Sequence, residues 1–158
     1  MSKTIQGNLL SITHGVFAHQ VNLMGVMGTL LAKQIKQRYP TVYAQYRLAL
    51  GCNRLVLGDI QIVQVTPELW VCNVAGQQYY GRNKEKCYTD YRALESAFAR
   101  LHQWQQCNNQ PVYLPRGMGT GLAGGDWGVI EKIIEARLPD AIIVELRELA
   151  PTALDALG

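Results

Sequence analysis

The stretch Pro115–Gly128 constrains the fold more than any other part of the sequence. It contains six of the fifteen glycines and joins the apolar segment Pro111–Pro115 to a helical pattern that Asp126 is placed to cap. A glycine-rich loop between a buried strand and a helix N-terminus presents backbone N–H groups that suit a phosphate. No Lys-Ser or Lys-Thr pair follows the glycines, which excludes a Walker loop. A flexible connector is the alternative interpretation.

A second loop of the same kind lies nearer the N-terminus. The pattern predicts a strand at Val16–Val21, a loop at Asn22–Gly28 and a helix that Thr29 caps and that Pro40 stops. Alone, this loop is as consistent with a plain turn as with a phosphate site. Two such loops in one small domain indicate a ligand with a diphosphate or several phosphates.

The remaining patterns alternate between strand and helix. A short first strand is expected around Thr4–Leu10, ending at Gly7-Asn8, with further strands at Ile60–Val65, Trp70–Ala75 and Ala141–Leu146. Helices are expected at Val42–Leu50, after a Thr89 cap, and after Asp126. Ile60–Val65 and Trp70–Ala75 read as an antiparallel hairpin. These elements predict a single α/β domain over 1–158, three-layered α/β/α with a mixed central sheet, with its core at about 4–146 and a C-terminal tail at 147–158. Ligands of such sheets bind at the carboxyl ends of the strands.

Composition excludes several classes of protein. Hydrophobic residues make up 48% and charged residues 17%, which excludes a disordered chain. Met1–Ile5 lacks the apolar run of a secretory signal, so a cytoplasmic protein is expected. The net charge of +3 is mild, and no block of like charges marks a nucleic-acid stripe. The four cysteines form no C-x-x-C pair, so we expect free thiols and no metal site.

Few residues suit catalysis. His19 lies just before the first loop, where an imidazole could serve as nucleophile or acid–base group, or could be a histidine bonded within the strand. None of the three serines lies in a G-x-S-x-G turn, and Cys72 lies in an apolar strand where thiols are usually inert. Tyr79-Tyr80-Gly81-Arg82 could stack on a base or ribose, or could be an ordinary loop.

The ordered set of motifs resembles the macro domain family, which binds ADP-ribose. The resemblance covers roughly Thr4–Leu146. Its pieces are Gly7-Asn8-Leu9-Leu10, Ala18-His19-Gln20-Val21-Asn22, Gly25-Val26-Met27-Gly28, Gly58-Asp59-Ile60, Asn73-Val74-Ala75-Gly76-Gln77 and Pro115-Arg116-Gly117-Met118-Gly119-Thr120-Gly121-Leu122. The chain is most similar to the branch that contains ADP-ribose 1″-phosphate phosphatases and some de-ADP-ribosylating enzymes.

The resemblance implies roles for particular residues. Asn8 and Leu9 would contact the adenine, and Asn22 the distal ribose. His19 matches a catalytic histidine of the phosphatase branch, and Asp126 could orient it or a water. The ligand would also contact Gly25, Val26, Met27, Gly28, Thr29, Gln77, Pro115, Gly117, Met118, Gly119, Thr120, Gly121 and Leu122.

The departures from the family concern catalysis. Asn8 replaces an aspartate that reads the adenine amino group, so adenine selectivity is expected to be weaker. One branch uses a lysine after the central strand and an aspartate in the glycine-rich loop. These positions fall at Gly76 and Ala123, so neither functional group is present, and Asp126 is also an expected helix cap.

The resemblance therefore implies a metal-independent phosphatase, without cofactor, that converts ADP-ribose 1″-phosphate to ADP-ribose and phosphate. The alternatives are a binding module that reads ADP-ribose without catalysis, a hydrolase that removes ADP-ribose from protein or nucleic acid, and a domain that binds another nucleotide. The expected partner is ADP-ribose or a derivative, with no membrane and with nucleic acid only as an ADP-ribosylated substrate. A monomer is expected.

Overall fold

Six strands form one mixed sheet in the computed structural model, which describes residues 3–28 and 30–146. The strands are β1 (Lys3–Gly7), β2 (Gly15–Val21), β3 (Ile60–Thr66), β4 (Leu69–Ala75), β5 (Val112–Pro115) and β6 (Ile142–Leu146). Their order is β1-β6-β5-β2-β4-β3. Neighbouring strands are parallel apart from β3 and β4, which form the antiparallel hairpin. The predicted mixed sheet is confirmed.

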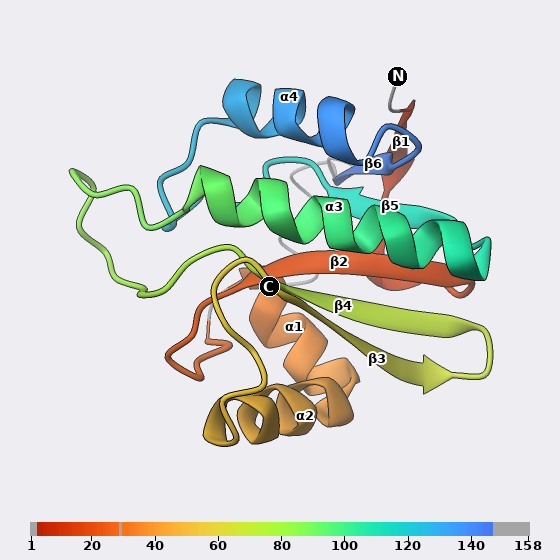
Figure 1. Cartoon of the computed structure of the whole chain (residues 1–158), viewed down its shortest axis with the longest axis horizontal. Coiled ribbons are helices and arrows are strands. Elements are labelled where there is room, and N and C mark those ends of the chain that lie inside the picture. Colours follow the sequence, from red (N-terminus) through yellow and green to blue (C-terminus); the bar gives the residue numbers. More distant parts are fainter. Residues whose placement is uncertain (1–2, 29, 147–158) are drawn as a thin grey trace, which may run out of the picture.

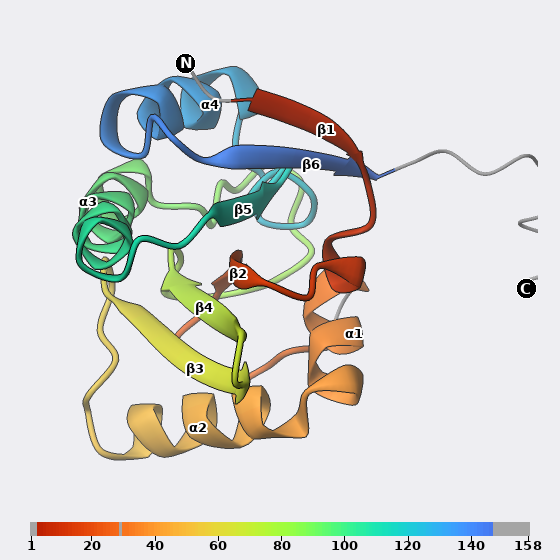
Figure 2. The same cartoon turned by 90° about the vertical axis from the view of Figure 1, so that its right-hand side faces the viewer.

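Helices cover both faces of this sheet (Figures 1 and 2). Helices α1 (Leu30–Arg38) and α2 (Pro40–Gly51) pack on one face, and α3 (Tyr91–Asn108) and α4 (Trp127–Arg137) on the other. A 3-10 turn, η1 (Leu9–Ser11), joins β1 to β2 and was not predicted. The arrangement is the expected three-layer α/β/α fold.

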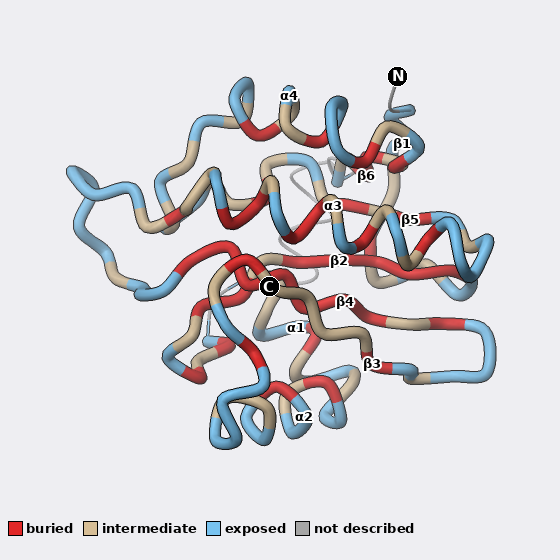
Figure 3. The backbone as a smooth tube through the Cα atoms, viewed as in Figure 1, coloured by how far each residue is buried: buried red, intermediate tan, exposed pale blue. Residues whose placement is uncertain are grey.

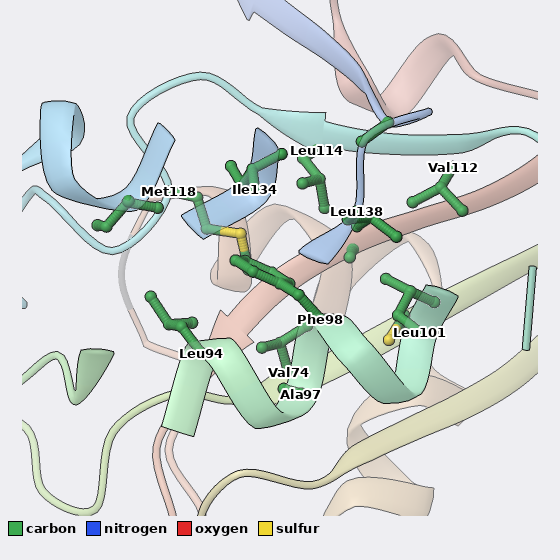
Figure 4. Close-up of a cluster of buried hydrophobic side chains, with 14 of the residues drawn as sticks. Val74, Leu94, Ala97, Phe98, Leu101, Val112, Leu114, Met118, Ile134 and Leu138 are labelled. Carbon is green, nitrogen blue, oxygen red and sulfur yellow. The ribbon is translucent and has the colours of Figure 1, made fainter. Parts of the chain in front are cut away.

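Each face of the sheet has its own apolar core. Figure 4 shows the core under α3 and α4, where the fully buried Phe98 lies between α3, α4 and the sheet. The side chains of β2 point alternately into the two cores. Val16 and Ala18 pack in the core under α3 and α4, and Phe17 and Val21 pack in the core under α1 and α2. Strand β2 is therefore buried on both faces, which is typical of a central strand between two helical layers. Figure 3 shows it as an almost wholly buried segment.

Two of the predicted helix starts need correction. Asp126 caps α4 as expected, since its Oδ1 accepts the Val129 N–H at 3.1 Å. The predicted Thr89 cap of α3 is wrong, because Asp90 accepts the Ala93 N–H instead. Helix α2 begins at Pro40, two residues earlier than expected, since proline is tolerated in a first helical turn.

No helix among residues 3–28 and 30–146 is long and apolar enough to cross a membrane. The four cysteines are free thiols, as expected.

Candidate functional site

The two glycine loops follow neighbouring strands and lie at the same edge of the sheet, where the chain connections diverge. Strands β2 and β5 are parallel neighbours, so both end at the same edge of the sheet. The chain leaves β2 for α1 on one face and leaves β5 for α4 on the opposite face. Adjacent strands whose connections diverge in this way open a crevice at their carboxyl ends, where α/β proteins bind ligands. Figure 1 shows the loops at this edge, on its left-hand side.

The first glycine loop, Asn22–Gly28, is attached to the core under α1 and α2 and to α2 itself. Its Met27 side chain is buried among the α1 and α2 residues. The Asn22 side chain bridges the loop: its Nδ2 donates to the Val26 carbonyl at 2.9 Å, and its Oδ1 accepts the Met24 N–H at 2.9 Å. Most of the hydrogen-bonding capacity of Asn22 therefore shapes the loop itself.

Tyr46 of α2 joins this loop to the helix layer. Its hydroxyl donates to the Asn22 carbonyl at 2.5 Å and accepts the Gly25 N–H at 3.1 Å. The side chain is fully buried, and burial raises the pKa of the Tyr46 hydroxyl to about 12. Gly25 has a φ of +83°, and a Cβ there would lie 2.8 Å from Nη1 of Arg47, so glycine is required.

The second glycine loop, Arg116–Gly125, is attached to the opposite core. Its Met118 side chain is buried with the α3 and α4 residues, as Figure 4 shows. The Thr89 hydroxyl donates to the Gly119 carbonyl at 2.7 Å and accepts from Nε2 of Gln20 at 2.9 Å. Gly119 has a φ of +78°, and a Cβ there would lie 2.9 Å from Oε1 of Gln20. The left-handed backbone favours glycine at 119, and a Cβ there would also displace the Gln20 amide.

The second glycine loop has the free donors of an anion site. No acceptor within the described residues takes the N–H groups of Gly119, Gly121 or Leu122. Asp126, which caps α4, is exposed in a cavity of about 540 Å³ that Arg116 and Thr120 also line. Unpaired N–H groups beside a helix N-terminus favour a phosphate or diphosphate group.

Exposed apolar side chains gather at the same edge of the sheet. Large apolar side chains that are more than a third exposed include Met24 in the first glycine loop, Leu122 in the second, and Tyr79 and Tyr80 after β4. Together they give the edge apolar contacts as well as phosphate donors, as a nucleotide ligand requires.

His19 lies inside the sheet rather than on a loop. Its Nε2 lies 2.6 Å from Oδ1 of Asn73, and the Asn73 Nδ2 donates to Oε1 of Gln61 at 3.0 Å. Because Oδ1 can only accept, Nε2 carries the hydrogen and Nδ1 is an unprotonated, buried acceptor without a partner in the described structure. The ring is 2% exposed, and burial outweighs the Asn73 bond and lowers the pKa of His19 to about 4.

Several residues predicted to contact the ligand form contacts within the protein itself, including the two predicted adenine contacts, Asn8 and Leu9. Oδ1 of Asn8 accepts the Leu10 N–H at 2.9 Å and caps η1, while Leu9 is buried in the core under α1 and α2. Gln77 is buried beside Gln20, with a hydrogen bond of 2.8 Å between their side chains. Pro115 ends β5, and Thr29 lies outside the described residues.

Two residues that determine the shape of the site were not predicted to do so from the sequence. Gln20 and Tyr46 contact the loops across the fold, 69 residues from Thr89 and 24 from Asn22 respectively. Local motifs carry no signal for such contacts. The only hint for Gln20 is a polar residue at a position where the strand pattern expects an apolar one.

The position of the family's lysine has no room for a side chain. A Cβ on Gly76 would lie 2.6 Å from Oε1 of Gln20 and 2.7 Å from Cδ2 of Leu94. Cys72 is fully buried, and burial raises the pKa of its thiol, which suppresses the thiolate a nucleophile needs. Neither position offers a nucleophile to the crevice.

Comparisons with known proteins agree with this geometry. No family model matches the chain. A DNA ADP-ribosyl glycohydrolase of Mycobacterium tuberculosis is 26% identical over 85% of this chain, which spans 38% of that relative's length. A macrodomain protein from Streptomyces coelicolor is 27% identical, with a TM-score of 0.77, over 94% of this chain and all of that one. Thermosipho africanus DarTG in complex with ADP-ribose is 16% identical, with a TM-score of 0.75, over 97% of this chain and 44% of that one. The chain therefore has the macrodomain fold.

Proposed function

We propose that this protein binds ADP-ribose in the crevice between the two glycine loops and hydrolyses the bond to a group carried at C1″ of the distal ribose. The observation that carries the proposal is the pair of glycine loops on opposite sides of the β2–β5 divergence, one with unpaired N–H groups. A larger protein that has this fold over 44% of its chain is known in complex with ADP-ribose.

In this proposal the diphosphate lies against the second glycine loop and accepts hydrogen bonds from the N–H groups of Gly119, Gly121 and Leu122. The distal ribose lies at the first glycine loop, whose shape Asn22 and Tyr46 determine. Fixed donors of this kind stabilise charge without reorganising during the reaction.

The first candidate substrate is ADP-ribosylated nucleic acid, because the curated relatives are DNA ADP-ribosyl glycohydrolases. Water would add to C1″, the bond from C1″ to the acceptor atom would break, and that atom would take a proton. The products are ADP-ribose and unmodified nucleic acid. Because position 76 carries glycine where one branch of the resemblance has a lysine, water rather than a side chain is the proposed nucleophile.

The second candidate is ADP-ribose 1″-phosphate, as the resemblance to the phosphatase branch implies. The exposed Asp126 carboxylate, in one cavity with Arg116 and beside the anion donors, favours it. Asp126 would orient water toward the 1″-phosphorus, the P–O bond would break, and ADP-ribose and inorganic phosphate would leave. His19 has a role here only if its buried ring gains access to the substrate.

The test compares three substrates with the purified chain and no added metal. ADP-ribose 1″-phosphate is followed by phosphorus NMR for inorganic phosphate. An ADP-ribosylated single-stranded oligonucleotide and a glutamate-ADP-ribosylated protein are followed by chromatography for free ADP-ribose. Release from the oligonucleotide supports the first candidate, and phosphate release supports the second.

Binding is measured separately by calorimetry with ADP-ribose. Binding without release from any of the three substrates would show a binding module. Absence of binding, or equal binding of ATP and ADP-ribose, would overturn the proposal.

A further inference from the structure

A segment beyond the two glycine loops exposes paired aromatic rings at the same edge of the sheet. This segment, Gln78–Tyr88, is called here the tyrosine loop. The side chains of Tyr79 and Tyr80 are 62% and 53% exposed, although most large apolar side chains of the described chain are in the two cores. Aromatic rings left in water at a ligand-binding edge indicate a binding surface.

The tyrosine loop is attached to both glycine loops. At its start, the Leu23 N–H donates to the Gln78 carbonyl at 3.1 Å, which links it to the first glycine loop. At its end, the Tyr88 N–H donates to the Ala123 carbonyl at 2.7 Å, which links it to the second. The exposed tyrosines therefore adjoin the crevice where the distal ribose is proposed to lie.

Further contacts fix the conformation of the tyrosine loop. Nε2 of Gln77 donates to the Tyr79 carbonyl at 2.8 Å, and the Tyr88 ring packs directly on Gly81, where a Cβ would meet it. The loop surrounds a cavity of about 420 Å³ that Tyr79, Tyr80, Tyr88 and Lys86 help to line. That volume is within the range of roughly 300–1,000 Å³ typical of small-ligand sites.

The same loop is basic. Arg82, Lys84 and Lys86 are exposed, with Glu85 as the only carboxylate between them. None of these three cations forms an ion pair within the described part of the chain. The loop thus combines exposed aromatic rings with unpaired positive charge, while the net charge of the whole chain is only +3.

We propose that the tyrosine loop binds single-stranded nucleic acid, with unpaired bases stacked on Tyr79 and Tyr80 and backbone phosphates at Arg82, Lys84 and Lys86. Stacking platforms beside basic grooves bind single strands without sequence preference. A duplex keeps its bases stacked on one another, and an acidic peptide uses the charges but not the rings. The position of this surface beside C1″ rests on the proposed function. In that case the tyrosine loop would hold the nucleotides that flank an ADP-ribosylated nucleotide.

The experiment measures binding of the full chain to an unmodified, labelled single-stranded oligothymidylate by fluorescence anisotropy at several salt concentrations. Stacking is worth about 1–3 kcal/mol per base, so we expect the double variant Tyr79→Ala, Tyr80→Ala to bind at least about fivefold more weakly. The double variant Tyr79→Phe, Tyr80→Phe retains the rings and should bind like the wild type.

The charge contribution is tested through the salt dependence. The double variant Lys84→Gln, Lys86→Gln should make the slope of log K against log salt shallower by about 1.4, at roughly 0.7 per phosphate contact. Lys132→Gln, which removes an exposed charge on α4, is the control and should change the slope much less.

Binding that survives the loss of both rings, or no binding by the wild type, would overturn the inference. Competition by polyglutamate as strong as that by an unlabelled oligonucleotide would overturn it as well. ADP-ribose binding is measured in the Lys84→Gln, Lys86→Gln variant and should be unchanged. If the oligonucleotide binds through the tyrosines while ADP-ribose does not bind at all, the proposed function fails and the inference about the tyrosine loop stands.

Discussion

The imidazole of His19 on β2 and the side-chain amide of Asn73 on β4 are hydrogen-bonded at 2.6 Å within the sheet. The two residues are direct partners in the parallel β2–β4 register, and Gln61 on β3 extends the row and donates to the Gln45 carbonyl of α2 at 2.8 Å. A polar row thus crosses three strands beneath an apolar helix layer. Its members are neutral and bonded to one another, and only Nδ1 of His19 lacks a partner within the described residues.

Burial of His19 predicts a loss of stability in acid. Its pKa is about 4 in the folded chain, against 6.5 in the unfolded chain. Below pH 6.5 the unfolded chain binds a proton that the folded chain does not, so this contribution to stability decreases from pH 6.5 to about 4 and then levels off. At 1.36 kcal/mol per pKa unit the loss is about 3 kcal/mol. Urea unfolding across this pH range measures it. His19→Gln, which can still donate to Asn73 but does not titrate, should lack this component.

The same variant tests the chemical role of His19. Because the ring is buried and bonded within the sheet, we expect it to position β2 against β4 rather than to touch the substrate. His19→Gln should therefore leave the Kd for ADP-ribose within twofold and the rate of ADP-ribose release within tenfold of the wild type. A fall in rate of about 10²–10⁴ with unchanged binding would instead establish acid–base chemistry at His19.

The sequence predicted the fold because its signals were local. Alternation within strands, glycine after β2 and β5, and the Asp126 cap each act within a few residues. The Thr89 cap was wrong because two capping residues stand side by side, and only the path of the second glycine loop decides between them. Thr89 bonds to Gly119, 30 residues away, which leaves Asp90 as the cap.

The shape of the candidate site could not be predicted in the same way. The sequence identified both glycine loops but not what determines their conformation. The Tyr46 hydroxyl on α2 bonds to Asn22 in the first glycine loop. The Gln20 side chain on β2 bonds to Thr89, just before α3. Such contacts depend on how whole helices and strands pack together, and local sequence periodicity does not predict that packing.

Gly119 tests whether the shape of the second glycine loop matters for binding. Gly119→Ala places a methyl group 2.9 Å from Oε1 of Gln20 in a left-handed backbone conformation, so the loop must move. We expect the Kd for ADP-ribose to rise at least tenfold. Gly51→Ala is the control, because a Cβ there meets nothing within 4 Å and the residue lies at the end of α2, outside both glycine loops. Wild-type affinity in Gly119→Ala would show that the diphosphate does not contact this loop as proposed.

Tyr46 tests the attachment of the first glycine loop to α2. Tyr46→Phe leaves the Asn22 carbonyl without its donor and the Gly25 N–H without its acceptor. Unsatisfied buried groups cost about 1–3 kcal/mol, which a denaturant titration measures, and calorimetry should show weaker ADP-ribose binding. Tyr43→Phe is the control, since its hydroxyl reaches the Gly25 carbonyl only at 3.4 Å from a half-buried site. Wild-type stability in Tyr46→Phe would show that the loop keeps its shape without the hydroxyl.

Gly76 tests whether this site can accept the lysine chemistry of related enzymes. Gly76→Lys places a Cβ 2.6 Å from Oε1 of Gln20 and 2.7 Å from Cδ2 of Leu94, so the side chain enters only by displacing both. Overpacking of this kind costs about 1–3 kcal/mol, and thermal unfolding should show the loss. The rate of ADP-ribose release should not increase. Gly51→Lys adds the same side chain where a Cβ meets nothing within 4 Å, and should leave stability unchanged. Faster release by Gly76→Lys, with a borohydride-trapped adduct on the new lysine, would show that the crevice already supports covalent chemistry and that Gln20 yields readily.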